Sequence, residues 1–167
     1  MEYDLIVLTT AVNRPEVHSK SLPDVVKMIN DNDLKVKWMF NIDKVTDDVS
    51  VEDTISNLQK ICSPFSCTFL QSEEPCFFDA VKRLVFESKD LLDDSKYGVL
   101  YLEDDWNLKN ADKFEEALKK YNDDGYVQLT DRSGNELSFN PSFWGKNIFK
   151  KLMVDLFEKH NDEGFLL

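Results

Sequence analysis

The sequence lacks the glycine-rich loops on which several large enzyme classes depend. Only 5 of its 167 residues are glycine, and neither a GxGxxG nor a GxxxxGK[ST] pattern occurs. In dinucleotide enzymes and P-loop kinases, these loops bring backbone N–H groups against phosphate oxygens. The sequence therefore argues against both classes.

Cysteine and long apolar runs are also scarce, and the 20 basic residues are outnumbered by 32 acidic ones. The three cysteines, Cys62, Cys67 and Cys76, include no CxxC pair, so we expect reduced thiols rather than zinc ligands or a disulfide framework. A net charge of −12 argues against nucleic acid as a partner, because phosphate binding depends on Lys and Arg. No apolar stretch approaches the ~18 residues that span a membrane, and the acidic start at residues 1–4 does not resemble a signal peptide. We therefore expect no transmembrane segment and a cytoplasmic location.

Short apolar runs alternate with amphipathic stretches through the first hundred residues. The runs predict strands over residues 5–9, 36–42, 67–71 and 99–102. Capping patterns at Ser21 and Ser50 predict the starts of two helices, and a third helix is expected from Pro75 to about Lys89. This alternation predicts an α/β fold with a mainly parallel sheet flanked by helices. The length suits a single domain over residues 1–167.

The pattern is looser after residue 106. We expect a helix from Asn110, a strand over 125–129, a short strand over 137–139, an aromatic loop over 141–145 and a last helix that ends near His160. The apolar residues 165–167 at the end are typical of a domain boundary or a truncated chain. Further domains of a longer chain therefore remain an open alternative.

Polar side chains follow each of the predicted strands. Right-handed crossovers place the carboxyl ends of parallel strands at one edge of the sheet, so we expect residues 9–14, Asp43, residues 71–74 and residues 103–105 to gather there. The last group, Glu103-Asp104-Asp105, forms an acidic turn directly after a buried strand. Such a turn is often only a solvated surface feature, but in α/β sheets this edge is where ligands bind.

Carboxylates in such a crevice suit a metal-bound diphosphate. A bare diphosphate would be repelled by roughly 4 kcal/mol per charge pair at ~4 Å and an effective dielectric of 20. Oxygen ligands suit Mg²⁺ or Mn²⁺, and such a cation also stabilises a departing nucleoside diphosphate. Glu103 and Asp105 are two residues apart, so they point to the same side if the strand geometry continues.

On these residues the sequence resembles glycosyltransferases of the GT-A fold, in which a DxD motif follows the fourth strand. Glu103-Asp104-Asp105 stands in the DxD place, and residues 9–15 resemble the loop that holds base and ribose. The resemblance implies a nucleotide-binding half over about 1–106 and an acceptor-side half over about 107–167. It implies that Asp105, with Glu103, binds Mn²⁺ or Mg²⁺, and that Glu103 and Asp104 support the metal or contact the ribose and sugar. The residues it assigns to the nucleoside of the donor are Thr9, Asn13, Arg14 and Asp43.

The sequence suggests functional roles for several other side chains, and for some of them a structural role is the alternative. Arg83 could reach the donor phosphates or be solvated, and His160 could join the metal or cap the last helix. Glu163 and Asp131 are the candidates for the base that deprotonates the acceptor. Trp106 and Trp144 could stack on acceptor sugars, whereas we expect Trp38 in the core and His18 at the surface.

The resulting expectation is a metal-dependent glycosyltransferase that moves a sugar from a UDP-sugar to a glycan or other hydroxyl acceptor. The alternative is a non-catalytic module of the same fold that binds nucleotide sugars or interacts with a partner. A phosphatase with a nucleophilic Asp, or a receiver domain, would need acids after the first strand, where this chain has Thr9 and Thr10.

Overall fold

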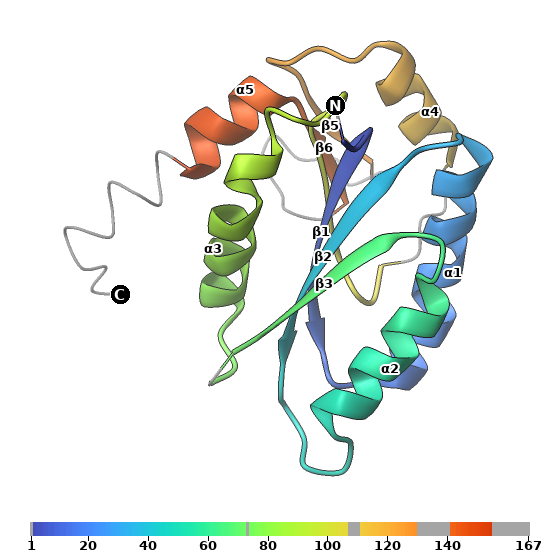
Figure 1. The fold of residues 1–167 in the computed structure, drawn as a ribbon, viewed down its shortest axis with the longest axis vertical. Coiled ribbons are helices and arrows are strands. Elements are labelled where there is room, and N and C mark those ends of the chain that lie inside the picture. Colours follow the sequence, from blue (N-terminus) through green and yellow to red (C-terminus); the bar gives the residue numbers. More distant parts are fainter. Residues whose placement is uncertain (1, 73, 107–110, 130–140, 155–167) are drawn as a thin grey trace, which may run out of the picture.

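A six-stranded sheet lies between two layers of helices in the computed structural model, which describes residues 2–72, 74–106, 111–129 and 141–154 (Figure 1). The strands are β1 (Leu5–Val12), β2 (Val36–Asp43), β3 (Ser66–Gln71), β4 (Val99–Glu103), β5 (Tyr126–Gln128) and β6 (Ser142–Trp144). The helices are α1 (Pro15–Asp31), α2 (Val51–Ile61), α3 (Phe77–Ser88), α4 (Ala111–Lys119) and α5 (Lys146–Phe149). A 3₁₀ turn, η1 (Lys89–Leu91), follows α3, and a π-helical turn, η2 (Lys150–Val154), follows α5.

The sheet is mixed, with the strand order β3-β2-β1-β4-β6-β5. Strands β1 to β4 are parallel, as predicted, but β6 runs antiparallel to both β4 and β5. The predicted aromatic loop over 141–145 is therefore wrong in part, because its residues 142–144 pair with 99–101 of β4. The α/β class is confirmed, whereas the expectation of a mainly parallel sheet holds only for the first four strands.

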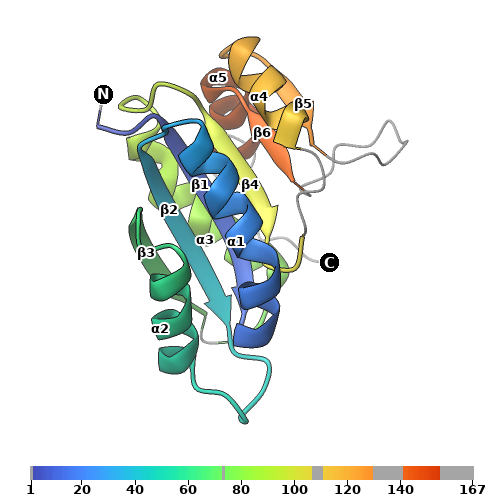
Figure 2. The same cartoon turned by 90° about the vertical axis from the view of Figure 1, so that its right-hand side faces the viewer.

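Alternate residues of the central strands supply two separate cores. In β1, Leu5 and Val7 pack on the side of α1, α2 and α4, whereas Ile6 and Leu8 pack on the side of α3, α5 and η2 (Figure 2). A strand covered on both faces has no polar side, which explains the unbroken apolar run at the start of the sequence. Trp38 is fully buried in the first of these cores, as predicted.

Helix α1 begins six residues before the predicted start at Ser21. Pro15 occupies its first turn, where the missing N–H costs nothing, and Pro23 lies inside the helix. Ser21 is an interior residue whose hydroxyl donates to the Val17 carbonyl at 3.0 Å. Because the helix starts earlier, the His18 side chain faces the sheet and is fully buried. The prediction that His18 lies at the surface is therefore wrong.

The predictions for α2 and α3 fit the structure better. The Ser50 hydroxyl accepts from the Asp53 N–H at 3.0 Å, which confirms the predicted cap of α2. The third predicted helix is present as α3, in which Val81, Leu84 and Val85 are buried and Phe78 is exposed. Within the described residues, no helix combines the length and apolar character needed to cross a membrane.

Candidate functional site

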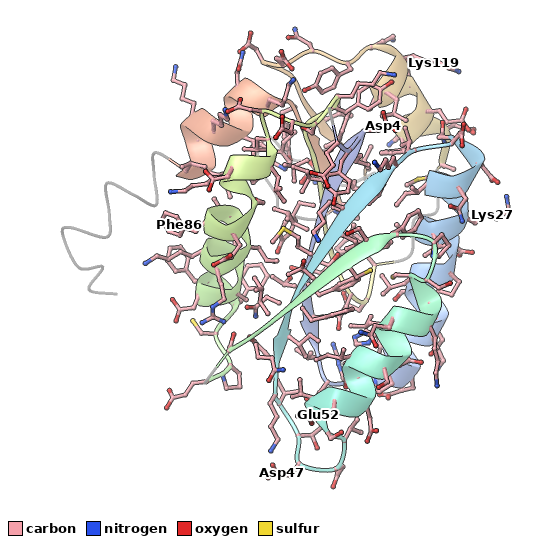
Figure 3. All side chains as sticks on the ribbon, in the orientation of Figure 1. Asp4, Lys27, Asp47, Glu52, Phe86 and Lys119 are labelled. Atoms are coloured by element: carbon pink, nitrogen blue, oxygen red, sulfur yellow. The ribbon has the colours of Figure 1, made fainter. Side chains whose placement is uncertain are left out.

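The strand order creates a crevice beside the central strand. From β1 the chain moves outward to β2 and β3, and then returns to place β4 on the other side of β1. The connections leaving β1 and β4 therefore diverge at their carboxyl ends, and such a switch point is where α/β sheets bind ligands. Figure 3 shows Asp47 and Glu52 at this end of the molecule and Asp4 at the opposite end.

A pocket of about 220 Å³ lies at this switch point. Its walls are formed by the carboxyl ends of β1, β2 and β4, by the acidic turn, by the residue before α1 and by the first turn of α3. The lining residues are Thr10, Ala11, Val12, Arg14, Asp43, Phe77, Ala80, Glu103, Asp104 and Asp105. The predicted gathering of Arg14, Asp43 and the acidic turn at one edge is therefore confirmed.

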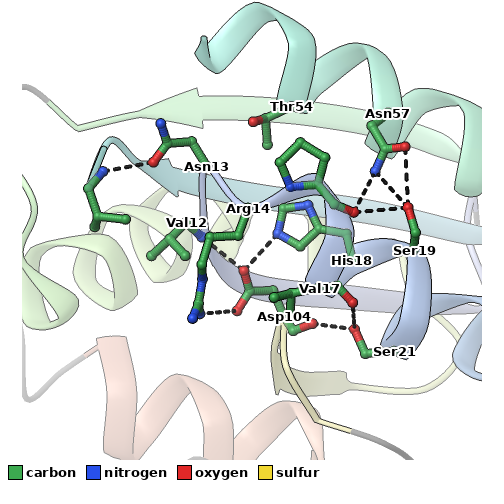
Figure 4. A network of polar contacts seen from close by, with 12 residues as sticks. Val12, Asn13, Arg14, Val17, His18, Ser19, Ser21, Thr54, Asn57 and Asp104 are labelled. Carbon is green, nitrogen blue, oxygen red and sulfur yellow. Dashed lines mark hydrogen bonds and ion pairs between the residues drawn. The ribbon is translucent and has the colours of Figure 1, made fainter. Parts of the chain in front are cut away.

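Asp104, the middle residue of the acidic turn, is an anchor between elements. The residue is 4% exposed, its carboxylate accepts from the Val12 N–H at 2.9 Å, and His18 Nε2 lies 2.7 Å from the same oxygen (Figure 4). The Arg14 guanidinium lies 3.9 Å from the other oxygen. These contacts exclude the solvated reading of Asp104 and hold β1 and α1 against β4.

The backbone of the acidic turn is fixed as well. The Asp104 N–H donates to the Thr10 carbonyl at 3.1 Å, and the single proton of the Ser21 hydroxyl is shared between the carbonyls of Asp104 and Val17. Since Asp104 is held on both sides, the positions of its neighbours, Glu103 and Asp105, follow from the same contacts. Both neighbours line the pocket.

Glu103 and Asp105 present the oxygen chemistry that a divalent cation needs. Asp105 is exposed, and one Glu103 carboxylate oxygen accepts from the Trp106 indole N–H at 3.0 Å. Among the described residues, no group of three or more His, Cys, Asp or Glu side chains is arranged to hold a metal. Binding of Mg²⁺ or Mn²⁺ by these two carboxylates would need further oxygens from a ligand and from water, and the predicted metal site stays a prediction.

Asp43 connects the end of β2 to the start of α3. One carboxylate oxygen accepts from the Asn41 amide and the other from the Cys76 N–H, each at 3.0 Å. Asp43 is largely buried by these contacts and still forms part of the pocket wall. Its predicted contact with a nucleoside stays a prediction.

Below the pocket, Thr10 contacts a buried tyrosine. The Thr10 hydroxyl lies 3.0 Å from the Tyr101 hydroxyl. Burial raises the pKa of Tyr101 well above its ordinary value, with smaller contributions from its neighbours. The side chain is therefore neutral at physiological pH and adds no charge beneath the acidic turn.

Two residues predicted to bind the donor are turned away from the pocket. Thr9 is fully buried, and its hydroxyl accepts from the Trp38 indole N–H at 3.0 Å. Asn13 is also fully buried, and its amide organises the loop over residues 44–50. Its nitrogen donates to the Thr46 and Val49 carbonyls, and its oxygen accepts from the Val45 and Thr46 N–H groups.

Arg83 and Trp144 also serve the scaffold rather than the pocket. Arg83 Nη1 donates to Asn41 and Ser72 at 2.9 and 2.8 Å, which ties α3 to the ends of β2 and β3. Trp144 is buried in β6, and its indole N–H donates to the Ser142 hydroxyl at 2.7 Å. A buried ring has no face left for an acceptor sugar, so the predicted stacking role of Trp144 is not supported.

The remaining predicted residues have different outcomes. Trp106 is half-buried beside Glu103, so its predicted contact with an acceptor is untested. Glu163, Asp131 and His160 lie outside the described residues, and their predicted roles stay predictions.

The sequence reasoning missed His18 and Phe77. The signal for His18 is its spacing of three and four residues from Ser21 and Leu22, which places all three on one helix face. Phe77 is the first residue of α3, and no periodicity reveals that it lines a pocket.

Compared with known proteins, the chain matches no family model, no curated protein and no solved structure.

Proposed function

We propose that the protein is a metal-dependent glycosyltransferase of the GT-A type that uses a nucleoside-diphosphate sugar, with UDP as the first nucleotide to test. The observation that supports this most is the acidic turn at the switch point. Glu103 and Asp105 line one pocket with Arg14 and Asp43, although these residues come from three different strand ends.

The charge of the pocket argues for a cation between protein and ligand. Asp43, Glu103 and Asp105 supply carboxylates, while the guanidinium of Arg14 lies against Asp104. A diphosphate in this pocket would be repelled, by roughly 4 kcal/mol per pair at ~4 Å and an effective dielectric of 20. Glu103 and Asp105 would hold Mn²⁺ or Mg²⁺, which would supply positive charge to offset that of the diphosphate.

Asp104 gives the proposed site its rigidity. Ligand groups must be held within about 0.5 Å of a productive geometry by contacts behind them. The contacts of Asp104 with Val12 and His18 meet this need, because they fix the turn that carries Glu103 and Asp105. In this proposal Asp104 is thus a positioning residue and not a ligand of the sugar.

The binding step is tested by thermal unfolding against a panel of nucleoside diphosphates and nucleotide sugars, with and without Mn²⁺. A ligand at ~100 times its dissociation constant adds about 2.7 kcal/mol of stability, which raises Tm by roughly 5–10 °C in a chain of this size. We expect such a rise only with Mn²⁺ and a nucleotide together, and its loss in Asp105→Asn. No rise with any nucleotide would overturn the proposal.

Turnover separates the enzyme from the non-catalytic module of the same fold. A transferase releases nucleoside diphosphate from the bound nucleotide sugar when an acceptor is present, whereas a module binds it without release. Glu163 and Asp131 are the proposed bases, so Glu163→Gln or Asp131→Asn is expected to slow release and leave nucleotide affinity unchanged. Binding without release across a broad panel of hydroxyl acceptors would favour the module.

A further inference from the structure

An exposed aromatic ring stands at the edge of the switch-point pocket. Phe77, the first residue of α3, is 49% exposed although phenylalanine is usually buried, and it lines the pocket. Its neighbour Phe78 is 44% exposed but does not line the pocket. Ala80, one helical turn after Phe77, forms part of the same wall and adds only a methyl group.

Phe77 and Asp43 lie at one end of the pocket, and the acidic turn lies at the other. The Cys76 N–H donates to the Asp43 carboxylate at 3.0 Å, so the start of α3 lies at the end of β2. Glu103 ends β4 and Asp105 lies in the turn after it, and β4 is separated from β2 by β1. With strands about 4.8 Å apart, the two ends lie roughly 10 Å from each other.

We propose that the ring of Phe77 stacks on the base of the nucleotide while the diphosphate extends toward Glu103 and Asp105. This inference rests on the proposed function and adds the orientation of the ligand and the residue that recognises its base. A planar base presents a π-face to an aromatic ring, and such stacking tolerates different bases. The pocket of about 220 Å³ is smaller than the ~300–1,000 Å³ that encloses a drug-sized ligand. We therefore expect the sugar of a nucleotide sugar to lie outside the pocket.

The test compares Phe77→Ala with Phe78→Ala, because the two rings are adjacent and similarly exposed. Calorimetric affinities are measured for UDP and for inorganic pyrophosphate, each with Mn²⁺. We expect Phe77→Ala to weaken UDP binding about tenfold, as loss of one stacked base does, and to leave pyrophosphate binding unchanged. Phe78→Ala is expected to bind both probes like the wild type, and Phe77→Tyr to retain UDP affinity.

A second measurement does not depend on the folding of a variant. If the base stacks on Phe77, the H5 and H6 proton resonances of UDP bound with Mg²⁺, which is diamagnetic, shift upfield in the wild type. The inference is overturned if these resonances do not shift, if Phe77→Ala keeps full UDP affinity, or if it loses pyrophosphate affinity equally. Failure of every nucleotide to bind the wild type would overturn the proposed function and this inference together, whereas the former results overturn the inference alone.

Discussion

At the scale of single residues, two neighbouring aspartates have opposite environments. Asp104 is buried against Val12 and His18, whereas Asp105 is exposed in the same pocket. Removing a charge from a buried hydrogen-bonded site leaves its partners unsatisfied, whereas the same change at an exposed site costs little. A substitution at Asp104 should therefore lower the stability of the fold, whereas one at Asp105 should affect ligand binding with little effect on stability.

We predict that Asp104→Asn lowers the free energy of unfolding by about 1–3 kcal/mol, because His18 and Arg14 lose their charged partner. Asp105→Asn, the matched control, is expected to change it by no more than about 0.5 kcal/mol. Urea unfolding followed by circular dichroism measures both values. Equal stability of the two variants would contradict the anchoring role of Asp104.

A second residue-scale prediction concerns alkaline pH. Burial raises the pKa of Tyr101 above its ordinary value of 10.0, so the folded protein keeps a proton that the unfolded chain releases. The contribution of Tyr101 to the free energy of unfolding is fully present below pH 10. It is lost as the pH rises further, by at most ~1.4 kcal/mol per pH unit. We expect Tyr101→Phe to lose less stability than the wild type between pH 10 and 11.5 in urea unfolding. Parallel losses in the two proteins would contradict the shift.

At the scale of elements, the boundaries of α1 and α2 show what local sequence can decide. Ser50 caps α2 as predicted because its hydroxyl meets the Asp53 N–H. Ser21 has the same local pattern but bonds the Val17 carbonyl, since the helix had already begun at Pro15. The burial of His18 follows from that start. A capping pattern alone could not show which of two prolines opens the helix.

The loop between β2 and α2 depends on one side chain from another element. The amide of Asn13 makes contacts to Val45, Thr46 and Val49, and their distances run from 2.7 to 3.3 Å. We predict that Asn13→Ala lowers the free energy of unfolding by about 2 kcal/mol and speeds hydrogen exchange of the Val45 and Thr46 amides. Native-state exchange measured by NMR tests this directly.

Ser50→Ala serves as the control for this loop, because it removes the cap of α2 at a cost of about 1 kcal/mol. It is expected to leave the exchange of the Val45 amide unchanged. If both variants speed that exchange equally, Asn13 has no special role in organising the loop.

At the scale of the whole molecule, the sequence predicts which edge of the sheet carries the site but not which side chains face the pocket. Because β1 extends to Val12, Thr9 faces Trp38 on one side of the sheet and Thr10 faces Tyr101 on the other. The loop predicted over residues 9–15 has no such alternation of side chains. The pairing of β6 with β4, which buries Trp144, is likewise a contact distant in sequence.

The central claim is that the switch-point pocket binds a nucleoside diphosphate through a cation held at Asp105. Isothermal titration of the wild type and Asp105→Asn with UDP, in the presence and absence of Mn²⁺, tests it most directly. We predict binding that is at least about tenfold tighter with Mn²⁺ in the wild type, equivalent to ~1.4 kcal/mol, and no effect of Mn²⁺ in Asp105→Asn. UDP affinity that is the same with and without Mn²⁺, or an Asp105→Asn variant that responds like the wild type, would contradict the claim.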